Sequence, residues 1–280
     1  MPVRVKAFLV HLVASAAVIL SLIAYVRWVW YPDALFWVEG VTDPLSVLFG
    51  VDVVLGPLLT LLLFVPGKKG LKFDMGMIIV LQVAALTYGA HVLWSARPVA
   101  VAFSGSAFQV ARAYEMPNVA LPDWAERIHP LGGPVLVFAD LSDDPNFALK
   151  VLMEGQPDIH LLTEQYRPVP ARMEQLHEHA YRLEVLLGSK PFTTAWQDRL
   201  GELPAVDAPV LVLPLYGHVA DGSVVLDAED GSLRAFLNVD ITGIRGAMPE
   251  RKAESPAPAA EPAAPDGPAT EEPARDDDAA

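Results

Sequence analysis

The chain has 280 residues, of which 52% are hydrophobic, and a formal net charge of −14. This acidic balance argues against binding to nucleic acid, because nucleic-acid binders carry basic patches, and it gives no polybasic signal for anionic lipid. The sequence has no cysteine, which excludes disulfides, a thiolate nucleophile and a cysteine metal site. A mean hydropathy of +0.33 indicates a membrane protein with a sizeable soluble part.

The first segment has the basic start and the apolar centre of a signal peptide, since Arg4 and Lys6 precede an apolar run over residues 7–26. The run ends in aromatic residues of the kind found at membrane interfaces, where a cleavage site would need small residues. We therefore interpret residues 7–30 as an uncleaved transmembrane helix. His11 interrupts the run and is expected to face the protein interior rather than to bind a ligand.

Two further apolar runs, at about residues 45–65 and 75–95, are each long enough to cross a hydrocarbon core of about 30 Å. The connector between them carries three lysines and is too short to hold a domain. The two runs are therefore predicted to form an antiparallel hairpin, and residues 1–96 are predicted to form a region of three transmembrane helices.

The orientation of the spans follows from their basic residues, which mark the cytoplasmic side of a membrane protein. Basic residues lie before the first predicted span and in the connector, whereas the loop at residues 32–44 contains acids and no lysine or arginine. The N-terminus is therefore predicted to be cytoplasmic, and everything after Arg97 is predicted to lie on the opposite side.

Asp52 lies in the second predicted span, and an ionisable residue at membrane depth is by default a functional hypothesis. If the span begins near Leu45, Asp52 lies about one to two turns into the leaflet that faces away from the cytoplasm. Its candidate partners are Arg27 and His91, which lie near the same ends of the other two spans. The alternative is an interfacial Asp52 that is hydrated or caps the helix.

Small and polar residues in the second and third spans predict close packing between them. Gly56 and Pro57 follow Asp52, and glycine and alanine recur in the third span. Small residues let helix backbones approach closely in lipid, and polar side chains such as Gln82 are expected to form hydrogen bonds between helices.

Residues 97–246 have the size of one compact domain, and their pattern predicts an α+β fold. Short apolar runs with turn residues between them predict a small, mainly antiparallel sheet, with turns at Ser104-Gly105 and Asp230-Gly231. The predicted strands cover residues 99–103, 108–113, 135–138, 210–216, 224–228 and 233–239, and the predicted helices cover residues 144–155, 170–188 and 191–203. Residues 247–280 are dominated by alanine, proline and acids, which predicts a disordered tail.

Candidate catalytic or metal-binding groups are few in the soluble domain. The His-Glu-His tract at residues 177–179 resembles a metal site, but residues two apart do not share a helix face. Asp140, Asp143 and Asp144 cluster near the end of a predicted strand, where Asp144 is better explained as a helix cap. The sequence has no phosphate-binding glycine loop, nucleophile elbow or zincin motif. We therefore expect no metal, no cofactor and no catalytic activity.

Short motifs in and beside the spans, and two motifs late in the soluble region, carry a resemblance to a known family. They are Lys-Ala-Phe at 6–8, Trp-Tyr-Pro at 30–32, Gly-Val-Asp-Val-Val-Leu-Gly-Pro-Leu-Leu-Thr at 50–60, Lys-Phe-Asp at 72–74, Leu-Gln at 81–82, Tyr-Gly at 88–89, Arg-Pro-Val at 97–99, Val-Leu-Asp at 225–227 and Asp-Gly at 230–231. With these motifs the sequence resembles the TfpX/TfpZ family of type IV pilin accessory proteins over about residues 5–240, most specifically in the spans.

The resemblance implies a protein of the bacterial inner membrane with a periplasmic domain. Such a protein would assist the assembly or stability of a cognate type IV pilin through direct contact, with the pilus machinery and membrane lipid as further partners. A pilin monomer has one apolar membrane helix and a periplasmic head, and its N-terminal amine is an alternative partner for Asp52 beside a structural pair with Arg27. The alternative function is a membrane enzyme that modifies pilin or a lipid-linked substrate; the resemblance supplies no catalytic residues.

Overall fold

The computed structural model describes residues 1–140, 146, 153, 155 and 157–249. Residues Met1–Pro249 form one compact unit. The predicted helix at residues 144–155 lies almost entirely outside the described residues, and so does the predicted tail from residue 250 onward. The predicted division between spans and soluble domain at residue 97 stays a prediction.

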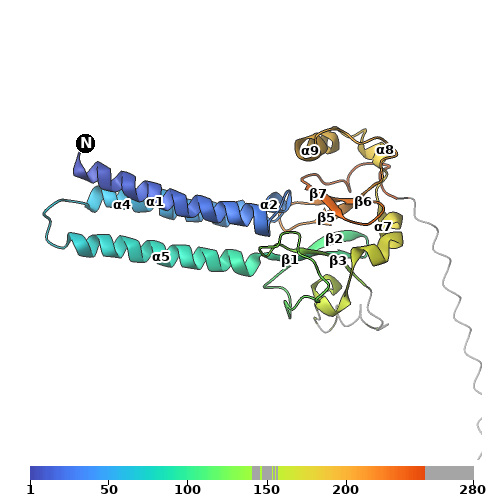
Figure 1. Ribbon diagram of the computed structural model, residues 1–280, viewed down its shortest axis with the longest axis horizontal. Helices are drawn as coiled ribbons and strands as arrows, with labels where there is room; N and C mark the ends of the chain where they lie inside the picture. Colours follow the sequence, from blue (N-terminus) through green and yellow to red (C-terminus); the bar gives the residue numbers. More distant parts are fainter. Residues whose placement is uncertain (141–145, 147–152, 154, 156, 250–280) are drawn as a thin grey trace, which may run out of the picture. The chain divides into compact units, whose positions relative to one another are not determined.

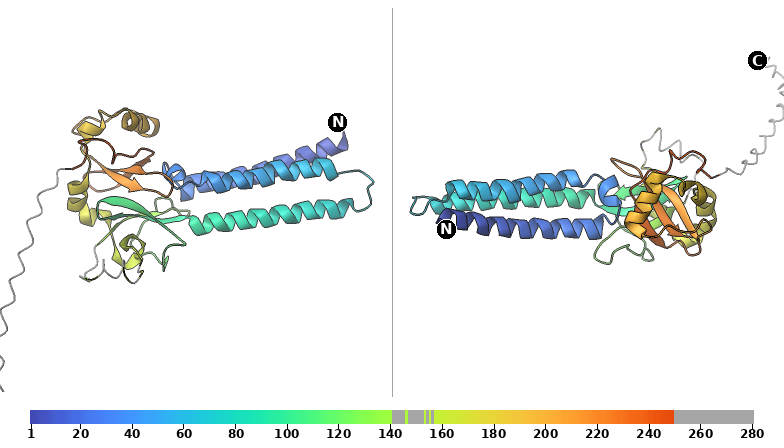
Figure 2. Two further views of the ribbon diagram at one scale, coloured as in Figure 1. Left: turned by 180° about the vertical axis from the view of Figure 1, so that it is seen from behind. Right: turned by 90° about the horizontal axis from the view of Figure 1, so that it is seen from above.

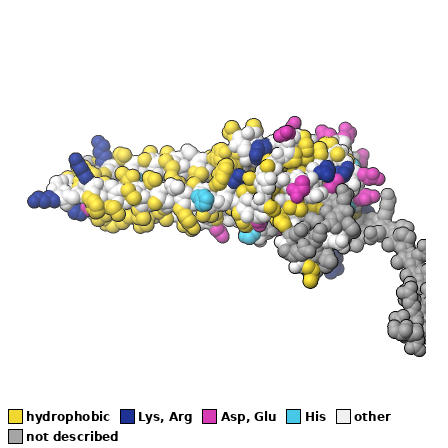
Figure 3. All heavy atoms as spheres, turned by 90° about the horizontal axis from the view of Figure 1, so that it is seen from below, with side chains coloured by type: hydrophobic (Ala, Val, Ile, Leu, Met, Phe, Trp, Pro, Cys, Tyr) yellow, Lys and Arg dark blue, Asp and Glu magenta, His cyan; other side chains and the backbone are white. Residues whose placement is uncertain are grey.

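Three continuous helices confirm the three predicted spans. The spans comprise α1 (Val3–Tyr25) with the π-helical turn η1 (Val26–Trp30), then α3 (Thr42–Phe49), the π-helical η2 (Gly50–Leu55) and α4 (Gly56–Leu63), and finally α5 (Leu71–Ala96). Each span is long and apolar enough to cross a membrane. Figures 1 and 2 show α1, α4 and α5 side by side, and Figure 3 shows hydrophobic side chains over most of their visible surface.

The last span leads directly into the sheet because of a proline. Pro98 disfavours the helical conformation at the residue before it, and Arg97 is accordingly extended, with φ −58° and ψ 141°. At the other end of α5, Gly70 has a φ of 91°, in the left-handed region that glycine adopts without steric cost. Gly70 and Pro98 therefore set the two ends of the third span.

The soluble domain contains a seven-stranded mixed sheet with the order β4-β3-β1-β2-β5-β6-β7. Two neighbouring pairs, β1/β3 and β2/β5, are parallel, and the other four pairs are antiparallel, so the prediction of a mainly antiparallel sheet is confirmed. The strands are β1 (Pro98–Ser104), β2 (Ala107–Arg112), β3 (Val135–Ala139), β4 (Tyr166–Arg167), β5 (Val210–Tyr216), β6 (Gly222–Asp227) and β7 (Leu233–Leu237). Among the strands in the described part of the chain, the two-residue β4 alone has no counterpart among the predicted strands.

The prediction of one helix over residues 170–188 is wrong. The segment instead forms the 3-10 helix η5 (Val169–Arg172), α7 (Met173–His179) and α8 (Leu183–Leu186). Between α7 and α8 the backbone amides bond outside the helix, since the Tyr181 amide donates to the Val212 carbonyl and the Arg182 amide donates to the Ala247 carbonyl, both at 2.8 Å. These bonds replace the helical hydrogen bonds that a continuous helix would need. The predicted helix at 191–203 is present as α9 (Lys190–Leu200). Two further 3-10 helices, η3 (Ile159–Leu161) and η4 (Thr163–Gln165), precede β4.

The loop between the first two spans packs onto the soluble domain through α2 (Leu35–Val38), in which Leu35 and Val38 are fully buried. Charged contacts reinforce this junction: the Arg112 guanidinium lies 2.6 Å from the Glu39 carboxylate, whose side chain is 2% exposed. Burial raises the pKa of Glu39 above its ordinary value, against the opposing effect of its bond with Arg112. The Tyr31 hydroxyl also donates to the Ala96 carbonyl at 2.9 Å, which ties the loop to the end of α5.

Candidate functional site between the membrane-spanning helices

One side chain from each span meets in a polar cluster within the helical bundle. His11 of α1 lies between Thr60 of α4 and Gln82 of α5, with its Nδ1 2.6 Å from the Thr60 hydroxyl and its Nε2 2.7 Å from the Gln82 carbonyl oxygen. Hydrogen bonds between side chains of different helices hold membrane bundles together, because lipid gives no hydrophobic driving force between helices. The three spans are therefore joined at one point by polar contacts.

Gln82 also links the cluster to the second span. Its amide nitrogen donates to the main-chain carbonyl of Asp52 at 3.1 Å. The space for this amide exists because residue 56 is glycine: a Cβ there would lie 2.0 Å from the Gln82 amide nitrogen. Gly56 and Pro57 are both buried at this contact-rich part of the second span. Gly56 thus leaves room for the Gln82 side chain, a role beyond the close approach of two helix backbones.

The hydrogen bonds of His11 are compatible with two protonation states. The Gln82 oxygen can only accept, so His11 Nε2 carries a hydrogen. In a neutral imidazole, Nδ1 then accepts a hydrogen bond from the Thr60 hydroxyl. In an imidazolium, Nδ1 donates to Thr60, and the Thr60 hydroxyl donates to the Gly56 carbonyl, 3.2 Å away. In either form both ring nitrogens of His11 have a hydrogen-bond partner on another span.

The Asp52 carboxylate is buried without a hydrogen-bond partner among the described residues. The residue is 5% exposed, and both carboxylate oxygens are unbonded. It lies in the π-helical η2, a departure from α-helix that is frequent at functional sites. The second span begins at Thr42, earlier than predicted, so Asp52 lies about 15 Å from either end at 1.5 Å per residue. Asp52 is thus near the middle of the span, deeper than the sequence led us to expect.

Neither predicted partner of Asp52 is brought to it. Arg27 donates to the Tyr31 carbonyl at 3.4 Å and stacks over the Phe36 ring, 5.5 Å from its centroid. Arg27 lies about 24 Å further along the first span than His11, at 1.5 Å per residue, and so well away from the level of the polar cluster. His91 is exposed on the surface of α5. A structural pair of Asp52 with Arg27 is therefore not the arrangement of this bundle.

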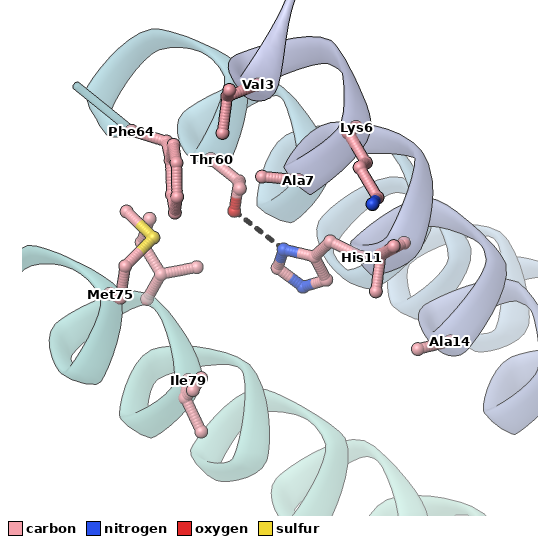
Figure 4. A pocket seen from close by; sticks show the side chains of 11 residues that line it. Val3, Lys6, Ala7, His11, Ala14, Thr60, Phe64, Met75 and Ile79 are labelled. Carbon is pink, nitrogen blue, oxygen red and sulfur yellow. Dashed lines mark hydrogen bonds between the residues drawn. The ribbon is translucent and has the colours of Figure 1, made fainter. Parts of the chain in front are cut away.

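A groove of about 440 Å³ lies beside the polar cluster, between α1 and α5 and with α4 at its base. Figure 4 shows His11 and Thr60 bonded to each other in this groove, with Lys6 from α1 and with Met75 and Ile79 from α5 across from them. The remaining lining residues are apolar: Val3, Ala7, Val10, Ala14, Phe64 and Ile78. The groove thus combines apolar walls with a single polar contact that joins two spans.

The candidate groups of the soluble domain have ordinary structural roles. Asp140 accepts hydrogen bonds from two nitrogens of the Arg172 guanidinium, one of them at 3.0 Å, and these bonds hold the pKa of Asp140 below its usual value. The rings of His177 and His179 bond main-chain carbonyls at 3.0 and 2.8 Å.

Asp143 and Asp144 lie outside the described residues. In the part of the chain that the structure describes, no three His, Cys, Asp or Glu side chains are placed to hold a metal ion.

Comparison with known proteins gives three similar fimbrial assembly proteins of Dichelobacter nodosus. The chain is 38% identical to the proteins of serogroup I and of serogroup E1, and 36% identical to that of serogroups C1 and C2, each over 96 residues. The match covers 34% of this chain, and it spans 37% of the first two relatives but 73% of the third. No family model and no solved structure matches the chain. At this identity, and with nearly three quarters of one relative covered, the chain belongs to the family of the fimbrial assembly proteins.

Proposed function

We propose that the protein is a non-enzymatic accessory factor of the bacterial inner membrane, of the TfpX/TfpZ kind, that assists the assembly or stability of a cognate type IV pilin by direct contact. The observation that carries this proposal is the similarity to fimbrial assembly proteins. The membrane-spanning helices support it, because a pilin monomer is itself anchored by one apolar helix. The proposed orientation has the N-terminus in the cytoplasm and the soluble domain in the periplasm, in keeping with the basic residues before α1 and between α4 and α5.

The groove between α1 and α5 is the part of the bundle best suited to receive the pilin helix. Its walls are apolar side chains from two separate helices, so a third apolar helix can pack between them. The His11–Thr60 bond at its base keeps the two spans in fixed register beneath the occupant. In this proposal the groove holds the membrane helix of the pilin while the soluble domain contacts its periplasmic head.

Site-specific photo-crosslinking in living cells tests the direct contact. A photoreactive phenylalanine analogue replaces Ile79, and the matched control places it at Val80. These neighbours on α5 are 58% and 62% exposed, but only Ile79 lines the groove. The expected result is a covalent adduct with pilin from position 79 and not from position 80. Adducts with lipid and machinery proteins alone would overturn direct contact, and equal pilin adducts from both positions would remove the groove as the place of contact.

The competing enzymatic function is separated from this proposal by the mass of the pilin. An assembly factor leaves the mass of pilin the same in the wild-type and the deletion strain, while surface pili are lost from the deletion strain. A pilin that loses a mass increment in the deletion strain would establish a modifying activity instead.

The proposed orientation has its own test. Alkaline phosphatase is active only outside the cytoplasm, so a fusion after Gly105 in the soluble domain is expected to be active and a fusion at Lys69 between α4 and α5 is expected to be inactive. The opposite pattern would overturn the periplasmic assignment of the domain.

A further inference from the structure

A second pocket lies where the first span and α2 meet the soluble domain. It has a volume of about 590 Å³ and is formed by side chains from η1, α2, α9 and the end of β7. Its floor includes Phe236 and Leu237, each 1% exposed, and Trp37 stands at its side with half of its surface exposed. This pocket is separate from the groove between the spans and shares no residue with it.

The charged residues of this pocket leave it with an excess of positive charge. Three cations and two acids line it: Arg27, Lys190, Arg199, Asp33 and Asp198. The Arg199 guanidinium lies 2.6 Å from the Asp33 carboxylate, so these two charges neutralise each other. Within the described residues, Arg27 and Lys190 form no ion pair, and Asp198 offsets one of their two charges. The pocket therefore complements a ligand with a single negative charge better than one with two.

Arg27 has further N–H groups that can donate hydrogen bonds to such a ligand. A guanidinium has five N–H groups in a fixed fork that suits phosphate oxygens. One nitrogen of Arg27 bonds the Tyr31 carbonyl at 3.4 Å, and its plane rests over Phe36, which fixes the direction of the side chain. Lys190, at the start of α9, is exposed and approaches the same pocket from the soluble domain. The two cations thus come from opposite sides of the junction between span and domain.

The position of the pocket along the first span indicates the source of the ligand. Arg27 lies three residues before Trp30, where the first span ends. Trp28 and Trp37 are 69% and 52% exposed, as is usual for aromatic side chains at the level of lipid headgroups. A phosphodiester headgroup carries one negative charge and continues into apolar chains, which matches the charge and the partly apolar lining of the pocket.

We propose that this pocket binds the phosphodiester headgroup of an anionic phospholipid in the leaflet that faces the soluble domain, with Arg27 and Lys190 as its charged ligands. The bound lipid would connect the end of the first span to α9 and so hold the soluble domain against the membrane surface. This site is local, which is why the acidic net charge of the whole chain gives no sign of it.

Native mass spectrometry of the full-length protein tests the proposal. The protein is titrated in detergent with phosphatidylglycerol and, in parallel, with phosphatidylcholine. The Arg27→Gln/Lys190→Gln variant is expected to lose about tenfold in affinity for the first phosphatidylglycerol, since each substitution removes a charge-assisted hydrogen bond. Arg245→Gln is the matched control, because it removes one exposed cation of the soluble domain outside the pocket. It is expected to leave the affinity unchanged.

Each contrary outcome overturns the proposal. These outcomes are equal retention of phosphatidylcholine, an unchanged affinity in the double variant, or an equal loss in Arg245→Gln. Displacement of the lipid by equimolar glycerophosphoglycerol, which has no acyl chains, would show a site for free phosphodiesters instead of lipid. Thermal unfolding checks that the double variant is folded; if it is not, the exposed Lys190→Gln alone is expected to show a smaller loss of the same selectivity.

Discussion

The interior of the membrane-spanning bundle contains a cluster of polar side chains among its apolar ones, whereas the interior of the soluble domain around Phe103 is apolar. In the soluble domain Phe103, Phe108 and Phe236 are at most 1% exposed and sit among other apolar side chains. In the bundle the side chains that meet between helices include His11, Gln82 and the buried Asp52.

The difference follows from the solvent of each region. In water, removal of apolar surface from contact with solvent drives the packing of a sheet and its helices. In lipid that gain is absent, since the lipid tails are as apolar as the side chains, and helices associate through close packing and hydrogen bonds. The same chain therefore covers its sheet with apolar side chains and adds polar contacts where α1 meets α4 and α5.

The largest effect is expected from a cavity in the apolar region. Phe103→Ala removes a ring that lies 5.3 Å from the rings of both Phe108 and Phe138. The substitution should lower the free energy of unfolding of the soluble domain by about 3–5 kcal/mol, measured by denaturant titration of the full-length protein in detergent. Val206→Ala, at an exposed position of the same domain, should change it by less than about 0.5 kcal/mol. Equal effects at the two positions would contradict an apolar core centred on Phe103.

The next effect concerns the space that Gly56 leaves for Gln82. Gly56→Ala should destabilise the bundle by about 1–3 kcal/mol, because the new methyl group displaces the Gln82 amide from its buried hydrogen bonds. Gly50→Ala is the control on the same span, since a Cβ there meets no atom within 4 Å. In a Gln82→Ala background the penalty of Gly56→Ala should disappear. Persistence of that penalty, in denaturation of the bundle in mixed micelles, would show that Gly56 serves backbone packing and not the polar cluster.

A smaller effect is expected for the coupling between His11 and Gln82. A double-mutant cycle with His11→Ala and Gln82→Ala should give a coupling free energy of about 0.6 kcal/mol, the average for interhelical hydrogen bonds in membranes, and at most about 1.7 kcal/mol. A cycle that pairs His11→Ala with Thr87→Ala should be additive, because the Thr87 hydroxyl donates to the Val83 carbonyl of its own helix. A coupling of zero between His11 and Gln82 would mean that the polar contact does not hold the spans together.

The smallest effect is expected at the surface of the soluble domain, from the ion pair between Asp140 and Arg172. Because Arg172 lowers the folded-state pKa of Asp140, the pair stabilises the domain above about pH 4, and this contribution is lost as the pH falls through the folded value. Asp140→Asn should cost less than about 1 kcal/mol at pH 7 and nothing in strong acid. A cost that is independent of pH would show that the charge of Asp140 is not what stabilises the domain.

The sequence predicts the spans and most strands because those elements have local signals. A run of apolar residues long enough to cross a bilayer predicts a spanning helix whatever the rest of the chain does. The strands β5, β6 and β7 are likewise marked by the turn residues between them. The prediction of a single helix over residues 170–188 is wrong because of contacts that the local sequence pattern does not indicate. Its leucines keep helical spacing, but the amides of Tyr181 and Arg182 bond partners that are distant in sequence.

The candidate site is only partly predictable for the same reason. His11, Asp52 and Gln82 stand out in the sequence as polar residues in apolar runs. Of these three, Asp52 is predicted as a site residue, whereas His11 is predicted only to face the interior and Gln82 only to form hydrogen bonds between helices. Thr60 carries a weaker signal, because a threonine can satisfy its hydroxyl within its own helix. Which polar residues meet depends on the depth and rotation of each helix. The early start of the second span at Thr42 shifts Asp52 away from Arg27 and toward the level of Gln82.

The measurement that tests the central claim most directly is surface piliation in an Asp52→Asn strain. This substitution keeps the shape of the side chain and removes its charge. Asp43→Asn makes the same change at an exposed position in the first turn of the second span. If the polar interior of the bundle takes part in pilus assembly, Asp52→Asn lowers the number of surface pili at a near-normal protein level, and Asp43→Asn does not. Wild-type piliation in the Asp52→Asn strain would contradict the account, and loss of the protein itself would reduce Asp52 to a structural role.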